Sequence, residues 1–230
     1  MQGGNRAIGR KIDQSNNCGM AAEVVMFRFD EQYLISALKA LPHASRVAFA
    51  AAAATRQVVS CGLVKYDEFS ASRLNDIVSD LWRAAQDLEI DAKFWSGRLE
   101  DIMNMMPSDE VDWDIWHALA DDCLSSLAYA IRCLLNQESQ DAAWAARRAY
   151  EAVDQAAIRL LGLRPGEASA EIGILSHEVV QREVSNQKKD LLMLRAGLFD
   201  EVKQNSFNNP SLTKQDVDAL TQVSKRNKFG

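Results

Sequence analysis

An acidic run around two tryptophans carries the most unusual local chemistry in this 230-residue sequence. Asp114, His117 and Asp121 are spaced i, i+3 and i+7, so one helix face would present all three and they could touch one cation. Tryptophan side chains surrounded by acidic residues could anchor a basic protein partner. Acidic residues alone are also typical of a solvent-exposed helix N-terminus. We predict a partner-binding surface made of Asp109, Glu110, Asp112, Trp113, Asp114, His117 and Asp121.

Metal chemistry would need more ligands than this run supplies. Di-iron bundles use Glu-x-x-His on two helices, and no second such motif is present. Residues 177–181 (HEVVQ) come within one residue of the zinc-protease pattern H-E-x-x-H, but a glutamine cannot replace the second imidazole. The four cysteines form no C-x-x-C pair. We therefore predict neither a metal nor a cofactor.

Motifs for nucleophilic or nucleotide chemistry are also missing. The sequence has no G-x-S-x-G elbow, no Walker loop and no G-x-G-x-x-G after a strand. Its three histidines, His43, His117 and His177, are the available imidazole bases. This favours a protein that is not an enzyme. Catalysis by carboxylates on facing helices stays open, because such pairs form across space.

The charge balance indicates the kind of partner. The net charge is −6 and the pI is about 5.2, and no basic face interleaved with aromatic residues suggests nucleic-acid binding. An acidic surface speeds the encounter with basic proteins. The longest apolar run, 47–54, is too short for a membrane span, and no secretory segment opens the chain. We expect a cytoplasmic protein with neither a nucleic-acid nor a membrane partner.

Hydrophobic spacing predicts an all-α, single-domain bundle of about seven or eight helices. Residues 1–25 lack a sustained period and are interpreted as a flexible tail before one helical domain, 26–230. The predicted helices cover 30–41, a stretch around 47–54, 66–88, 91–106, a fifth capped by Ser108, 139–161, 168–202 and a last one beginning near Thr213.

Small residues in the sixth predicted helix recur at intervals of three and four. This small-residue stripe consists of Ala142, Ala146, Ala149, Val153, Ala156 and Leu160. Small side chains let two helices approach closely, so we expect tight antiparallel packing here. An exposed part of the stripe would alternatively serve a homodimer. Cys123 and Cys133 fall in helical pattern and are expected to be buried.

With the helices placed, the order of signals resembles the YjaG-like family of bacterial proteins, whose domains have no known function. The resemblance covers about residues 30–197 and depends on collinear order. It rests on 41–51 (LPHASRVAFAA), Tyr66 and Phe69, 74–82 ending in Trp82, Leu99-Glu100 with Pro107, 118–123 (ALADDC) and 177–194. The chain departs from the family at Thr55-Arg56-Gln57, where E-R-M-x-P-N-Y is usual, and at His177-Glu178, where H-P is usual. The resemblance implies an all-α fold and no established activity.

Small acidic helical domains are also similar to immunity proteins, which neutralise secreted toxins. Our main hypothesis is therefore a non-enzymatic bacterial protein-binding module, in one form an immunity protein that blocks a basic toxin or effector. Two alternatives stay open. One is a carboxylate-based metal- or small-molecule-dependent enzyme, and the other is a homodimeric structural module.

Overall fold

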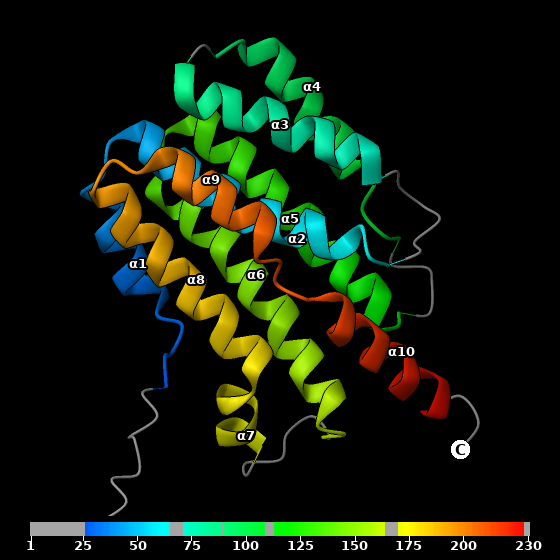
Figure 1. Cartoon of the computed structure of the whole chain (residues 1–230). Helices are drawn as coiled ribbons and strands as arrows, with labels where there is room; N and C mark the ends of the chain where they lie inside the picture. Colours follow the sequence, from blue (N-terminus) through cyan, green and yellow to red (C-terminus); the bar gives the residue numbers. More distant parts are fainter. Residues whose placement is uncertain (1–25, 65–70, 89, 109–112, 164–169, 228–230) are drawn as a thin grey trace, which may run out of the picture.

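Ten α-helices make up the secondary structure of the residues that the computed structural model describes, which are 26–64, 71–88, 90–108, 113–163 and 170–227 (Figure 1). The predicted all-α class is confirmed. The predicted tail, 1–25, lies outside the described residues. The helices are α1 (Glu31–Lys39), α2 (His43–Cys61), α3 (Ala71–Asp87), α4 (Ala92–Met103), α5 (Ile115–Asn136), α6 (Ser139–Leu160), α7 (Ala170–Ser176), α8 (Glu178–Arg195), α9 (Phe199–Asn208) and α10 (Lys214–Asn227).

Helices α2 and α6 occupy the centre of the bundle. In α2 every residue from Val47 to Val58 is buried, and six of them are alanines. Helix α6 packs against α5, α2, α1 and α8. Alanine at these contacts lets the helix axes approach closely, which explains how two helices can be enclosed by the others. The tight packing predicted for α6 is confirmed.

The small-residue stripe has little surface to offer a second copy of the chain. Its first five members are buried, and Leu160 is partly exposed. Neighbouring helices of the same chain cover those five members, so of the stripe only Leu160 is partly open to a second copy. The predicted burial of Cys123 and Cys133 is confirmed, and both are free thiols.

The start of α5 differs from the prediction. Ser108 does not cap this helix; Asp114 does, and its Oδ1 accepts hydrogen bonds from the backbone N–H of Trp116 (2.8 Å) and His117 (3.1 Å). These bonds satisfy two of the N–H groups that a helix start leaves without partners. The first turn of α5 therefore begins at Ile115.

The predicted single helix 168–202 is wrong as well, because the structure has three helices there. His177 is the N-cap of α8, where its Nδ1 lies 3.4 Å from the backbone nitrogen of Val179. Gly197 has φ +76°, a left-handed conformation that separates α8 from α9 and that glycine adopts at little cost.

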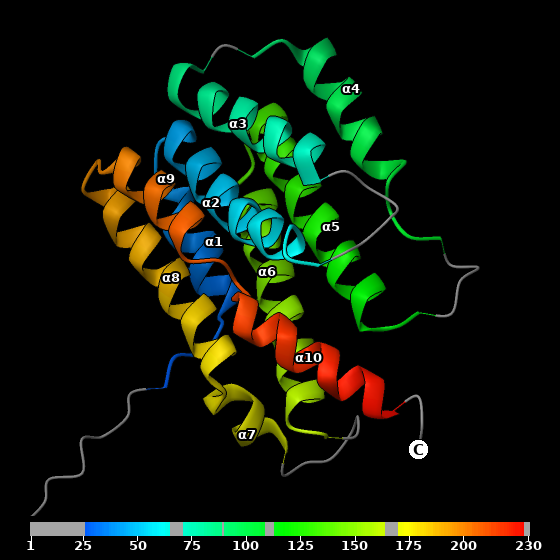
Figure 2. The ribbon, with the colours of Figure 1, turned by 45° about the vertical axis from the view of Figure 1, so that its right-hand side comes forward.

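The outer helices cover the central ones in two groups. Helix α3 packs on α2 and α4 on α5, so this hairpin lies on one side, while α8 packs on α6 and α9 on α2 (Figure 2). None of the ten helices has both the length and the apolar character that crossing a membrane requires. The bundle thus leaves the α3–α4 hairpin and the start of α5 at its surface.

Candidate functional site

The predicted partner-binding surface is described in part. Asp109, Glu110 and Asp112 lie outside the described residues. Trp113 is 44% exposed, and its Nε1 donates a hydrogen bond to the carbonyl oxygen of Ser108 (3.2 Å). This bond holds the indole in place while much of the ring remains open to solvent.

Asp114 and His117 form a local pair. Nδ1 of His117 lies 2.8 Å from Oδ1 of Asp114, and the ring centroids of His117 and Trp113 are 6.5 Å apart. Partial burial favours the neutral carboxyl, but hydrogen bonds from His117 and from the Trp116 backbone outweigh it and lower the pKa of Asp114. Asp114 is therefore anionic at neutral pH beside an exposed tryptophan.

The last predicted residue, Asp121, faces α6, where its Oδ2 lies 3.9 Å from Nη1 of Arg148. The same Nη1 contacts Asp122 (3.1 Å) and Glu151 (3.2 Å). In the described part of the chain, no three His, Cys, Asp or Glu side chains are placed to hold a metal ion. The arrangement seen is a network of ion pairs between α5 and α6.

Asp122 follows the acidic run and is not one of the predicted partner-binding residues, yet it has the most perturbed environment of this network. It is 1% exposed, and burial raises its pKa to about 7, although Arg148 opposes the shift. Nε2 of Gln155 donates to its Oδ2 at 3.1 Å. A pocket of about 210 Å³ adjoins the network, with Arg148, Glu151 and Trp144 in its lining. The carboxyl can exchange a proton near neutral pH.

A second network lies at the centre of the bundle. Arg56 of α2 contacts Glu183 through Nε (3.2 Å) and Asp190 through Nη1 (2.5 Å), and all three side chains are fully buried. Gln187 donates to Oε1 of Glu183 (2.9 Å), and the Ser211 hydroxyl donates to Oε2 (2.7 Å). This interior network joins α2, α8 and the segment before α10.

The electrostatics of the interior network fit a structural role. Burial disfavours the charge on Arg56, but Asp190 and Glu183 outweigh that effect and raise its pKa further above its ordinary value. Burial raises the pKa of Asp190 even though Arg56 opposes it. With every member at most 2% exposed, these groups face one another and not a ligand.

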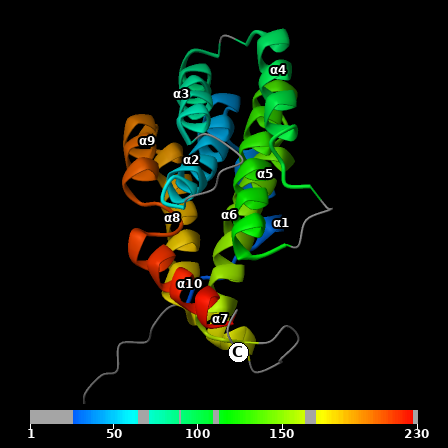
Figure 3. The ribbon, with the colours of Figure 1, turned by 90° about the vertical axis from the view of Figure 1, so that its right-hand side faces the viewer.

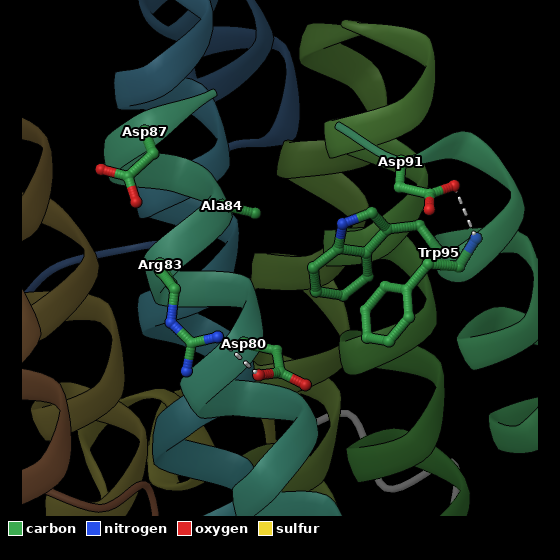
Figure 4. A pocket seen from close by; sticks show the side chains of 7 residues that line it. Asp80, Arg83, Ala84, Asp87, Asp91 and Trp95 are labelled. Atoms are coloured by element: carbon green, nitrogen blue, oxygen red, sulfur yellow. Dashed lines mark hydrogen bonds and ion pairs between the residues drawn. The ribbon is translucent and has the colours of Figure 1, made fainter. Parts of the chain in front are cut away.

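A hollow between α3 and α4 is the other feature that sequence reasoning missed (Figure 4). This α3–α4 pocket has a volume of about 210 Å³ and opens to the surface. Asp91 caps α4 by accepting hydrogen bonds from the backbone N–H groups of Lys93 (3.0 Å) and Phe94 (3.1 Å). The lining consists of Asp80, Arg83, Ala84, Asp87, Asp91, Phe94 and Trp95.

The two aromatic side chains of the α3–α4 pocket differ in their solvent exposure. Trp95 is 3% exposed, whereas Phe94 is 42% exposed, and their rings meet edge to face with centroids 5.3 Å apart. The solvent exposure of Phe94, which marks this pocket as a candidate site, is evident only from the structure.

This arrangement of helices has a counterpart among solved structures. A crystal structure of a DUF416 family protein from Shewanella baltica matches it with a TM-score of 0.65, over 76% of this chain and 93% of that chain. The chain has the DUF416 fold. YjaG-like proteins are DUF416 proteins, so the predicted resemblance is confirmed at the level of the fold.

The DUF416 match does not extend to a site. Sequence identity between the two chains is 16%, so the likeness concerns the arrangement of helices. No protein-family model matches the sequence, and no curated protein matches it.

Proposed function

We propose that this DUF416-fold protein is a non-enzymatic protein-binding module that recognises a basic partner. Its binding surface is formed by α3, α4 and the start of α5; Figure 3 shows α3 and α4 at the upper end of the bundle. The observation that carries the proposal is the exposure of two aromatic side chains beside carboxylates. Trp113 adjoins Asp114, and Phe94 shares the α3–α4 pocket with Asp91.

Interface energetics support this choice. Aromatic anchors are enriched at the centres of protein interfaces, and complementary charge raises the association rate. The interior network contributes nothing to this surface, since its charges are enclosed. A bacterial immunity protein that neutralises a basic toxin or effector is the finer form of the proposal.

A pull-down from the native host tests the proposal. Wild-type protein should retain a stoichiometric basic partner, and retention should fall as salt rises because exposed charges are screened. Trp113→Ala should weaken binding by a factor of about 30, as expected for an interface anchor. Phe207→Ala removes an exposed aromatic from α9, which is not part of the proposed surface, and should leave binding unchanged. An empty or salt-insensitive pull-down contradicts the proposal.

A small-molecule enzyme is the second candidate, favoured by Asp122. A carboxyl with a pKa near 7 is suited to proton transfer at neutral pH, and Arg148 links it to a pocket. A thermal-shift screen of metabolites and metals tests this function. A ligand that raises Tm in the wild type and fails to do so in Asp122→Asn would support it. Homodimer formation, the remaining proposal, is addressed by light scattering.

A further inference from the structure

We propose that the α3–α4 pocket receives one lysine or arginine side chain from a basic segment of a partner protein. The proposal rests on the proposed function and deepens it, because it assigns the partner's cation to a defined place. Three independent features of the described part of the pocket support it: carboxylates without a counter-ion, an exposed aromatic ring, and an indole N–H without an acceptor.

The carboxylates of the pocket are not equally available. Asp80 is already neutralised, since Nη1 of Arg83 and Nη2 of Arg98 each lie 3.3 Å from one of its oxygens. Asp87 has no basic partner among the described residues. Asp91 uses Oδ1 to cap α4, and no described group donates to its Oδ2. Two carboxylates are therefore left to attract an external cation.

The exposed ring of Phe94 provides the second feature. Cζ of Arg98 lies 5.0 Å from the Phe94 ring centroid while its Nη2 contacts Asp80. The protein's own arginine thus shows that a cation is stable here between a ring and a carboxylate. Asp87 and Asp91 line the same pocket as the Phe94 ring.

The third feature is the indole of Trp95. The side chain is almost completely buried, and the edge that carries its nitrogen is turned toward Ala84 (Figure 4). No described residue accepts a hydrogen bond from this N–H. Because this donor has no acceptor within the protein, a ligand that brings an oxygen can bond to it in place of water. A basic residue within a peptide brings both a cation and a carbonyl oxygen.

The size of the pocket further restricts the range of possible ligands. Its volume of about 210 Å³ is below the roughly 300–1,000 Å³ of typical small-molecule sites. One long side chain with its own carbonyl group suits this space, and a whole helix does not. The ligand class is therefore a single cationic residue in an extended segment.

N-acetyl-arginine methylamide and its lysine analogue are suitable probes, with the norleucine analogue as the uncharged control. In a ¹H–¹⁵N NMR titration the Trp95 indole signal, assigned with Trp95→Phe, should shift and saturate with the cationic probes only. Asp87→Asn combined with Asp91→Asn should weaken binding about tenfold. Asparagine retains the N-cap of α4. Asp76→Asn, an exposed acid on α3 outside the pocket, should bind as the wild type does.

The outcomes separate this inference from the proposed function. Equal shifts with the norleucine analogue, or unchanged affinity in the Asp87/Asp91 double variant, overturn the pocket assignment. A partner captured equally by the wild type and the double variant also overturns it, while the binding-module function stands. Saturable probe binding together with an empty pull-down supports the assignment of the pocket as a cation site and refutes the proposed function.

Discussion

Removal of the buried arginine gives the sharpest test of how this bundle is held together. Arg56→Met keeps the length and apolar character of the side chain and deletes its charge. In the wild type the guanidinium contacts Glu183 at 3.2 Å and Asp190 at 2.5 Å, with all three side chains fully buried. The variant therefore leaves two enclosed carboxylates without their cation.

The loss of stability in Arg56→Met arises mainly from the unpaired carboxylate of Asp190. Glu183 retains two other hydrogen-bond donors, whereas Asp190 retains only the Asn205 amide at 3.4 Å among the described residues. Breaking a buried pair by removing one partner costs about 3–5 kcal/mol. For a chain of this length each kcal/mol lowers Tm by about 2–4 °C, so we expect a decrease of about 6–20 °C.

The loss should depend on pH with a definite sign. Burial already raises the pKa of Asp190, and loss of Arg56 removes the charge that opposes this shift. A carboxyl whose folded-state pKa is raised destabilises the fold above its unfolded pKa, near 4, and the penalty disappears as pH falls toward that value. The difference in Tm between variant and wild type should therefore be larger at pH 8 than at pH 5.

Differential scanning calorimetry at the two pH values, supported by urea unfolding, measures these effects. Adding Asp190→Asn to Arg56→Met should restore much of the lost stability, because the unpaired charge is then absent. Arg83→Met is the matched control. It breaks an exposed ion pair with Asp80 and should cost less than about 1 kcal/mol. A loss of under 1 kcal/mol for Arg56→Met, or one that grows as pH falls, would refute the reasoning.

Other parts of the fold give three further expectations. Asp122→Asn should flatten the fall in Tm between pH 4 and pH 7, since burial raises the pKa of this carboxyl to about 7 and its ionisation opposes folding; Tm measured across that range checks this. Ala146→Leu should cost about 1–3 kcal/mol by overpacking the α6 contact, whereas Ala92→Leu on the exposed face of α4 should be near neutral in urea unfolding. Asp114→Ala should lose about 0.5–2 kcal/mol with the α5 cap, and Asp114→Asn less, in the same assay.

Sequence periodicity is sufficient to predict the central packing. The interval of small residues in α6 follows from the 3.6-residue turn, so the sequence alone places Ala142, Ala146 and Ala149 on one buried face. The start of α5 is less predictable. Both Ser108 and Asp114 are good N-caps, and local pattern does not distinguish them.

The interior network lies beyond such pattern reasoning. Arg56 is 127 residues from Glu183 and 134 from Asp190 along the chain, so only the packing of α2 against α8 reveals the pairing. The polar side chains at 183, 187 and 190 fall at intervals of four and three, the one local signal of a shared face. In the sequence Gln187 interrupts an apolar face, whereas in the structure it completes the hydrogen bonding of Glu183.

The contrast between enclosed and exposed acids explains why recognition is assigned to the outer helices. A carboxylate can attract a partner only if its field reaches solvent and no arginine of the same chain already binds it. Glu183 fails on both counts, and Asp122 is enclosed and held by Arg148. Among the described residues, Asp87 and Asp91 meet both conditions beside an exposed ring. Their position on the hairpin that packs over α2 and α5 lets a partner bind there without disturbing the packed centre of the bundle.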